Sequence, residues 1–157
     1  MKKAFLLCMI CLMTLSALSQ QAEYVDLGLP SGTLWKSKNE KGKYYTYEKA
    51  MRKFGSQMPT RGQFAELKAY CTWTWTWTWN GSGYTVTGNN GNYIVLPAVG
   101  YRTDYGRLKF VGTDGFYWSS NPCGEFYVWI LCFGSRDIDI SNFGIFSGLS
   151  VRLVKKL

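Results

Sequence analysis

The sequence of 157 residues contains no histidine. This absence excludes Ser-His-Asp and Cys-His catalysis, histidine-ligated zinc or haem, and a histidine-based pH switch. Acidic residues are scarce as well: ten Asp and Glu stand against eighteen Lys and Arg, for a net charge of +8. What is abundant is aromatic residues, at 17%, together with 17 glycines. This composition excludes a disordered tail and indicates one globular domain, rich in strands and loops.

The first segment is typical of an export signal. Lys2 and Lys3 precede an apolar run at residues 4–18, and the small residues Ala17 and Ser19 predict cleavage before Gln20. The run is shorter than the roughly 20 residues that a membrane-spanning helix needs. We therefore expect a signal peptide at residues 1–19 and a single domain at residues 20–157. The mature chain would have no transmembrane segment and would be periplasmic, displayed on the cell surface or secreted.

Three cysteines lie in the predicted mature chain, namely Cys71, Cys123 and Cys132. Outside the cytoplasm Cys123 and Cys132 could close a short disulfide loop, but buried or incidental thiols are an equally good interpretation. No CxxC pair occurs among the three, so neither a zinc ribbon nor a thioredoxin-type site is indicated.

The order of predicted elements is a strand, two helices and then many strands, which is an α+β pattern. Residues 24–29 and 33–35 are predicted strands, and a short helix is predicted at 47–54. Thr60 and Gln63 have the spacing of a capping box, so a second helix follows, with Phe64, Leu67 and Cys71 on one face. Later strands are predicted at residues 83–87, 93–96, 116–118, 128–133, 138–140 and 149–154.

Two segments suggest binding to a polymer, and each has a simpler interpretation. Tryptophans at 73, 75, 77 and 79 alternate with threonine, so a strand here would carry four indoles on one face. They could stack on sugars or single-stranded nucleic acid, but we favour indoles that pack partly under loops. The basic stretch 36–53 could attract a polyanion, yet such runs are usually solvated and no nucleic-acid motif accompanies this one.

Residues 121–149 mix bulky apolar side chains with Gly, Asn and Ser without a regular period. Apolar groups on glycine-rich loops are typical of a recognition surface, and a small core beneath the loops is the alternative. Asp137 and Asp139 could form a carboxylate pair or hold a cation, but Asp-Ile-Asp-Ile is best explained as a strand with its acids outward.

Several motifs together resemble one bacterial family. Residues 24–35 (YVDLGLPSGTLW) resemble the opening of "major paralogous domain" proteins. Its later landmarks are matched at residues 58–60, 64–67, 71–73, 96–98, 100–102, 117–120 and 150–152. The resemblance implies a C-type-lectin-like fold, related to that of the formylglycine-generating enzyme, in which residues 24–29 pair with residues 151–154. The calcium and sugar motifs of true C-type lectins are absent, so no metal or other cofactor is expected.

The C-terminal part resembles variable proteins of diversity-generating retroelements, in which adenine positions of a repeat are rewritten. Residues 117–120 and 150–154 correspond to the fixed frame. Between them, Ile130, Cys132, Gly134, Asp137, Asp139 and residues 141–147 are all reachable from an Asn codon by changing only its adenines. The resemblance implies a variable ligand-contact region at about residues 123–149.

These observations favour an exported, non-catalytic module that binds a protein or glycan and no nucleic acid. The predicted ligand-binding residues are Glu125, Phe126, Tyr127, Trp129, Ile130, Cys132, Arg136, Asp137, Asp139, Phe143, Ile145, Phe146, Ser147 and Leu149. Phe126, Tyr127, Trp129, Ile130, Phe143, Ile145 and Phe146 are the expected apolar anchors. Two alternatives stay open: a thiol or metal enzyme using Cys123 and Cys132, and a structural surface subunit.

Overall fold

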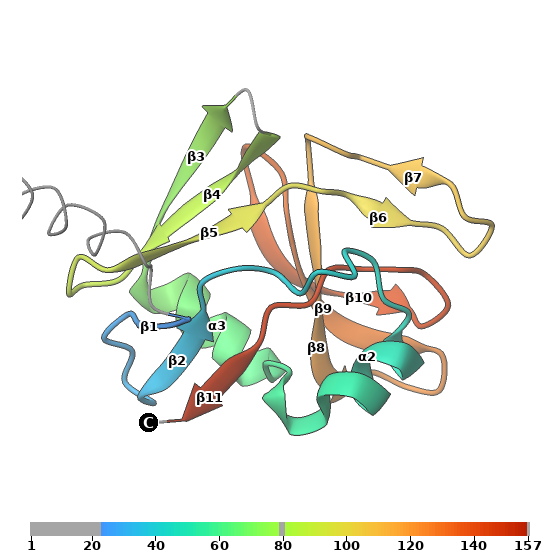
Figure 1. Ribbon diagram of the computed structural model, residues 1–157, viewed down its shortest axis with the longest axis horizontal. Helices are drawn as coiled ribbons and strands as arrows, with labels where there is room; N and C mark the ends of the chain where they lie inside the picture. The colour runs from blue at the N-terminus through green and yellow to red at the C-terminus, as the bar shows by residue number, and fades with distance from the viewer. Residues whose placement is uncertain (1–22, 79–80, 157) are drawn as a thin grey trace, which may run out of the picture.

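The computed structural model describes residues 23–78 and 81–156, in which two α-helices are followed by most of the strands (Figure 1). The elements are β1 (Tyr24–Asp26), β2 (Thr33–Lys36), α2 (Tyr47–Phe54), the 3-10 helix η1 (Gly55–Gln57), α3 (Arg61–Tyr70), β3 (Thr72–Thr78), β4 (Gly81–Thr87), β5 (Tyr93–Pro97), β6 (Tyr101–Arg102), β7 (Leu108–Lys109), β8 (Gly115–Pro122), β9 (Tyr127–Phe133), β10 (Ile138–Gly144) and β11 (Val154–Lys156). The predicted signal peptide and Trp79 lie outside the described residues.

The strands form four small sheets, and every pairing between them is antiparallel. Their orders are β1-β2-β11, β10-β9-β8, β3-β4-β5 and β6-β7. In Figure 1, β3 and β4 rise at one end of the molecule and the β6-β7 hairpin extends at the other. The predicted α+β class, with early helices and short antiparallel strands, is confirmed.

Helix α3 begins, and helix α2 ends, where local chemistry predicts. The Thr60 hydroxyl accepts the Gln63 N–H at 3.1 Å, and the Gln63 side-chain oxygen accepts the Thr60 N–H at 2.8 Å, which completes the capping box at the start of α3. Helix α2 ends at Gly55, whose N–H still donates to the carbonyl of Met51 and whose φ of 50° turns the chain out of the helix. Phe64 and Leu67 face the core as expected.

The expected pairing of the first and last strands is wrong. Strand β2 lies between them and pairs with β1 on one side and with β11 on the other. Thr33, Leu34 and Trp35 are all buried, so β2 is covered on both faces and takes the central position. The last strand is also shorter than predicted, because Leu149 and Ser150 form only isolated bridges and regular pairing begins at Val154.

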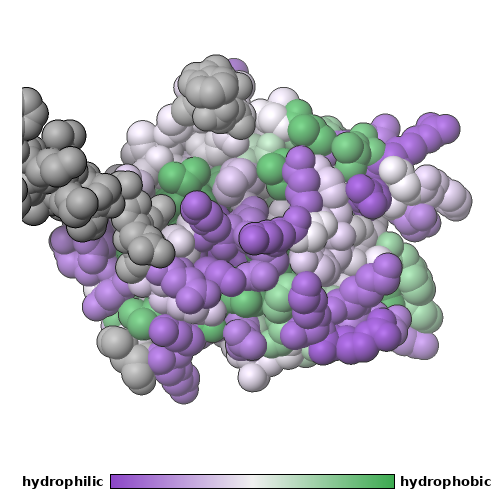
Figure 2. Space-filling model, viewed as in Figure 1, coloured by the Kyte–Doolittle hydropathy of each residue, from purple (hydrophilic) through white to green (hydrophobic). Residues whose placement is uncertain are grey.

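The sheet β8-β9-β10 separates two hydrophobic cores. Leu131 and Phe133 of β9 point into one core with Trp35, Phe64 and Leu67. Successive side chains of a strand point to opposite faces, so Val128 and Ile130 point into the second core, which Ala50 and Phe54 of α2 also enter. Outside these cores, the face seen in Figure 2 mixes hydrophilic side chains with smaller apolar patches.

A buried polar network connects distant segments of the chain. The Arg152 guanidinium donates to Asn39 Oδ1 at 2.8 Å, to the Lys36 carbonyl at 2.9 Å, and to the carbonyls of Ser37 and Val95. Asn39 in turn donates to the hydroxyl of Tyr117 at 3.0 Å. Because these partners belong to separate elements, the network fixes the C-terminal segment against β5, β8 and the loop after β2.

The Tyr117 hydroxyl also donates to the carbonyl of Pro97 at 2.7 Å, so Tyr117→Phe should test the network. We predict that this variant lowers the free energy of unfolding by about 1–3 kcal/mol, because two buried polar groups lose their partner. Urea denaturation measures the change. Tyr105→Phe, at a ring that is 88% exposed, is the control and should change stability by less than about 0.5 kcal/mol. Equal midpoints for the two variants would contradict the prediction.

Candidate functional site

The predicted ligand-binding residues lie along the β9-β10 ribbon and in the loops at its ends. The register places Gly144 opposite Tyr127 at one end and Ile138 opposite Phe133 at the other. Strands of seven residues span about 20 Å, so the two ends are separate places on the surface. Phe126, Tyr127 and Phe146 lie at the first end, whereas Arg136, Asp137 and Asp139 lie at the second.

The first end displays large apolar rings. Phe126, Tyr127 and Phe146 are 50%, 52% and 63% exposed, and the ring centroids of Phe126 and Phe146 are 6.4 Å apart. The Ile145 N–H donates to the Phe126 carbonyl at 3.1 Å, which holds the two loops side by side. We call Phe126, Tyr127, Trp129 and Phe146 the aromatic edge.

Trp129 extends the aromatic edge toward helix α3. The Arg61 guanidinium lies 3.7 Å above the Trp129 ring, within the range of a cation–π contact. The Arg61 N–H, at the start of α3, donates to Asn121 Oδ1 at 2.7 Å, so helix and sheet are joined here. Sequence reasoning missed Arg61, since no local pattern connects it to a tryptophan 68 positions later.

Two of the predicted contact residues are core residues instead. Ile130 is 1% exposed and Leu149 is fully buried. Ile130 points to the face of β9 opposite Trp129, into the second core, and both backbone groups of Leu149 bond to Tyr45 at 2.9 Å. The prediction for these two positions is wrong because each side chain fills a core that a ligand cannot reach.

Phe143 and Ile145 are half-buried. The Phe143 ring packs against Tyr101 at 4.8 Å and Phe116 at 5.6 Å between centroids, and Ile145 packs against the second core. Much of their apolar surface is therefore already covered within the chain. Among the expected apolar anchors, the exposed ones are Phe126, Tyr127 and Phe146, and Trp129 is half-buried like Phe143 and Ile145.

The remaining predicted residues are polar or small. Glu125 is exposed beside Phe126, and Ser147 is half-buried, with its N–H donating to the Gly144 carbonyl. At the far end Asp139 Oδ1 accepts the Ile140 N–H at 2.8 Å and lies 4.0 Å from Lys68 Nζ. Arg136 and Asp137 are exposed in the turn between β9 and β10.

The three cysteines of the described residues are not joined by a disulfide. Cys71, Cys123 and Cys132 are free thiols, and Cys132 donates to the Asp139 carbonyl with a separation of 3.7 Å. Burial raises the pKa of the Cys132 thiol to about 11, and the carboxylate of Asp139 adds to this effect. A nucleophilic or metal-binding thiol needs a lowered pKa, so this environment works against that chemistry. Among residues 23–78 and 81–156, no cluster of acidic or cysteine side chains could hold a metal ion.

The Trp-Thr run forms strand β3, and its indoles are covered to different extents. Trp73 and Trp75 pack against Tyr84 and Phe133 in the first core, and Trp73 Nε1 donates to the Leu67 carbonyl at 3.2 Å. Trp77 is 68% exposed. The preferred interpretation, indoles packed partly under the fold, is confirmed for Trp73 and Trp75.

No family model matches the chain, and neither a curated protein nor a solved structure does. In the described part of the chain, both helices are too short to cross a bilayer. Function must therefore be inferred from the surface itself.

Thiol alkylation tests the electrostatics around the cysteines. Burial raises the pKa of Cys71 to about 11 as well, so at about pH 8 both Cys71 and Cys132 hold their protons. We predict that iodoacetamide modifies these two thiols about a hundredfold more slowly than free cysteine, because the thiolate is the nucleophile. Mass spectrometry of the digested protein measures the rates, and urea-unfolded protein is the control. Rapid labelling of Cys132 in the folded protein would contradict the raised pKa.

Paired substitutions separate displayed rings from packed ones. Phe143→Ala should lower the free energy of unfolding by about 2 kcal/mol, because it opens a gap beside Tyr101 and Phe116. Phe146→Ala should change it by less than about 0.5 kcal/mol, because that ring is mostly in water. Thermal and urea denaturation measure both changes in stability. A larger loss for Phe146→Ala than for Phe143→Ala would show that Phe146 is the packed ring and Phe143 the displayed one.

Proposed function

We propose that this protein is an exported, non-catalytic binding module that recognises a protein or glycan ligand through the aromatic edge. The observation that carries the proposal is the display of three rings, each at least half exposed, on two hydrogen-bonded loops at one end of a sheet. Clustered apolar surface of this kind marks interaction sites in soluble proteins. Aromatic and arginine side chains also contribute most of the binding energy at such sites.

The aromatic edge is held by a rigid support. Tyr127 begins strand β9, most of whose residues pack into the two cores, and Phe126 immediately precedes it. Phe146 lies two residues after the end of strand β10. Rings fixed in this way lose little conformational freedom when a ligand binds, and that increases the affinity. The ligand-contact region of the proposal is therefore smaller than residues 123–149 and consists of the loops at one end.

The charges near the aromatic edge also favour an uncharged ligand. Glu125 is the acid beside these rings and Arg61 is the nearby base, so the two charges offset each other. A polyanion gains most of its affinity from clustered positive charge, which the aromatic edge does not offer. Stacking on sugar rings or on apolar protein side chains accounts better for the residues displayed.

The proposal includes a lectin-like scaffold with a diversified C-terminal region. It is supported by the order of motifs in the sequence and by the α+β architecture, in which the first and last strands share one sheet with β2. A gene for a reverse transcriptase beside a near-copy of the 3′ end, differing only at adenines, would support the diversification. If no such gene and near-copy are found, the proposed binding module stands without the diversification.

A structural surface subunit is the second candidate, and the β6-β7 hairpin favours it. Tyr105, Leu108, Phe110 and Val111 are all exposed on or beside this hairpin. A neighbouring copy could cover these side chains, and apolar burial at about 25 cal/mol per Å² would stabilise the contact. Sedimentation velocity distinguishes the candidates: a monomer at high concentration favours the binding module, whereas concentration-dependent assembly lost in Tyr105→Ser favours the subunit.

The decisive experiment compares the wild type with the double variant Phe126→Ser/Phe146→Ser on arrays of immobilised glycans and displayed peptides. We predict that the variant loses the wild-type hits, by at least about tenfold in affinity, while its melting temperature changes little. Tyr105→Ser removes a ring that is 88% exposed, more than either Phe126 or Phe146, from the turn between β6 and β7, and should keep those hits. Retention of all hits by the double variant would overturn the proposal.

A further inference from the structure

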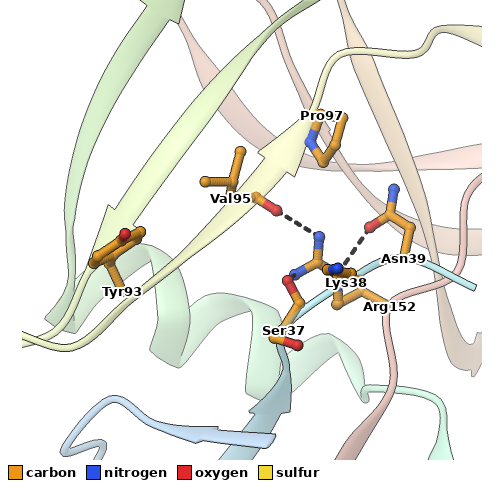
Figure 3. A pocket seen from close by; sticks show the side chains of 7 residues that line it. All are labelled: Ser37, Lys38, Asn39, Tyr93, Val95, Pro97 and Arg152. Carbon is orange, nitrogen blue, oxygen red and sulfur yellow. Dashed lines mark hydrogen bonds between the residues drawn. The ribbon is translucent and has the colours of Figure 1, made fainter. Parts of the chain in front are cut away.

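A cavity of about 290 Å³ lies between the loop after β2 and the outer face of β5 (Figure 3). Ser37, Lys38 and Asn39 line it from the loop, Tyr93, Val95 and Pro97 line it from β5, and Arg152 lines it from the C-terminal segment. The lining combines apolar surface with a few polar groups, as in small-molecule sites, and its volume is at the small end of their range.

The charge in this cavity is unbalanced. Arg152 is 1% exposed, and its hydrogen bonds go to three backbone carbonyls and one amide oxygen. Within residues 23–78 and 81–156 no carboxylate forms an ion pair with it. The acid that acts on it electrostatically is Glu40, whose carboxylate is bound to Lys36 at 2.6 Å. A buried positive charge without a counter-ion is costly, and a bound anion would offset part of that cost.

Burial lowers the pKa of Arg152 to about 10, so the guanidinium stays charged at neutral pH. A guanidinium has five N–H donors, and four hydrogen bonds are formed within the described residues. The phenol that neighbours it, Tyr117, is uncharged, because burial raises its pKa to about 12. The exposed Lys38 at the cavity adds a second positive charge.

A second cavity of about 370 Å³ adjoins the first, since Val95 and Pro97 line both. It is bordered by Lys43 and by the hydroxyls of Thr76 and Thr85, on the face of the sheet opposite the buried indoles. No acidic residue lines either cavity in the described part of the chain. We call the two together the β5 groove.

We propose that the β5 groove binds an acidic glycan, with the carboxylate of one sugar near Arg152 and Lys38 and the next sugar near Lys43. Carboxylates complement the two lysines and the uncompensated guanidinium. The half-exposed Tyr93 ring, with Val95 and Pro97, offers apolar surface for the C–H faces of sugar rings. This site uses none of the residues of the aromatic edge, so it does not depend on the proposed function.

Calorimetric titration with tetragalacturonate and with its methyl ester tests the proposal. The ester keeps the shape of the sugar and removes its charge, so we expect it to bind at least about tenfold more weakly. Binding of the acid should also weaken as salt is raised, because Lys38 and Lys43 are exposed. Equal binding of acid and ester, or no binding of the acid at millimolar concentration, would overturn the proposal.

Variants locate the site. Lys38→Gln should weaken tetragalacturonate binding by about tenfold, whereas Lys49→Gln, on the exposed side of α2, should leave it unchanged. Val95→Asp places a negative charge at the junction of both cavities and should abolish binding, with folding checked by circular dichroism. Arg152 itself is unsuitable, since its removal leaves four buried acceptors without a donor.

Two further titrations distinguish the β5 groove from the aromatic edge and from a nucleic-acid site. Phe126→Ser/Phe146→Ser should bind tetragalacturonate as the wild type does. Loss of binding in that variant would show that the glycan binds at the aromatic edge and not in the β5 groove. A single-stranded DNA of equal charge should bind more weakly than the glycan. Tighter binding of the DNA would assign the groove to nucleic acid and overturn the proposal.

Discussion

A single buried guanidinium joins the two ends of this fold. Arg152 lies in the C-terminal segment, yet its acceptors belong to β2, to the loop after it and to β5. Through Asn39 and Tyr117 the same network reaches β8, the strand that pairs with β9. An unpaired donor or acceptor here would cost the full desolvation of a buried polar group, so the segments must keep their relative positions. Both the aromatic edge and the β5 groove are built on elements that this network fixes.

The sequence was most informative where a local signal specifies a local structure. Thr60 and Gln63 predicted the start of α3, residues 47–54 were predicted as the short helix α2, and the alternation of Trp and Thr predicted β3, all confirmed. Strand order was the part that failed. Thr33, Leu34 and Trp35 show no alternation, because β2 is buried on both faces, and such a run says nothing about which strands lie beside it.

The candidate site was predicted only in part, for a related reason. Phe143 and Phe146 are the same residue type three positions apart, but Phe143 meets Tyr101, a residue 42 positions earlier, whereas Phe146 meets mainly solvent. Their different exposure is therefore decided by contacts with residues that are distant in the sequence. The contact of Arg61 with Trp129 is likewise long-range. The sequence does hold one signal for the buried network: Arg152 stands between the apolar residues Val151 and Leu153, and a lone charge within an apolar segment indicates buried polar partners.

The central sheet β8-β9-β10 has a core on each of its two faces, and this limits how the protein can change over evolution. A new side chain at an inward position of β9 must fit one core or the other, because protein interiors are packed as densely as organic crystals. Exposed loop residues at the end of the ribbon, such as Phe126 and Phe146, belong to neither core and can be exchanged at little cost to folding. Sequence changes can therefore accumulate at these positions while the same scaffold is inherited.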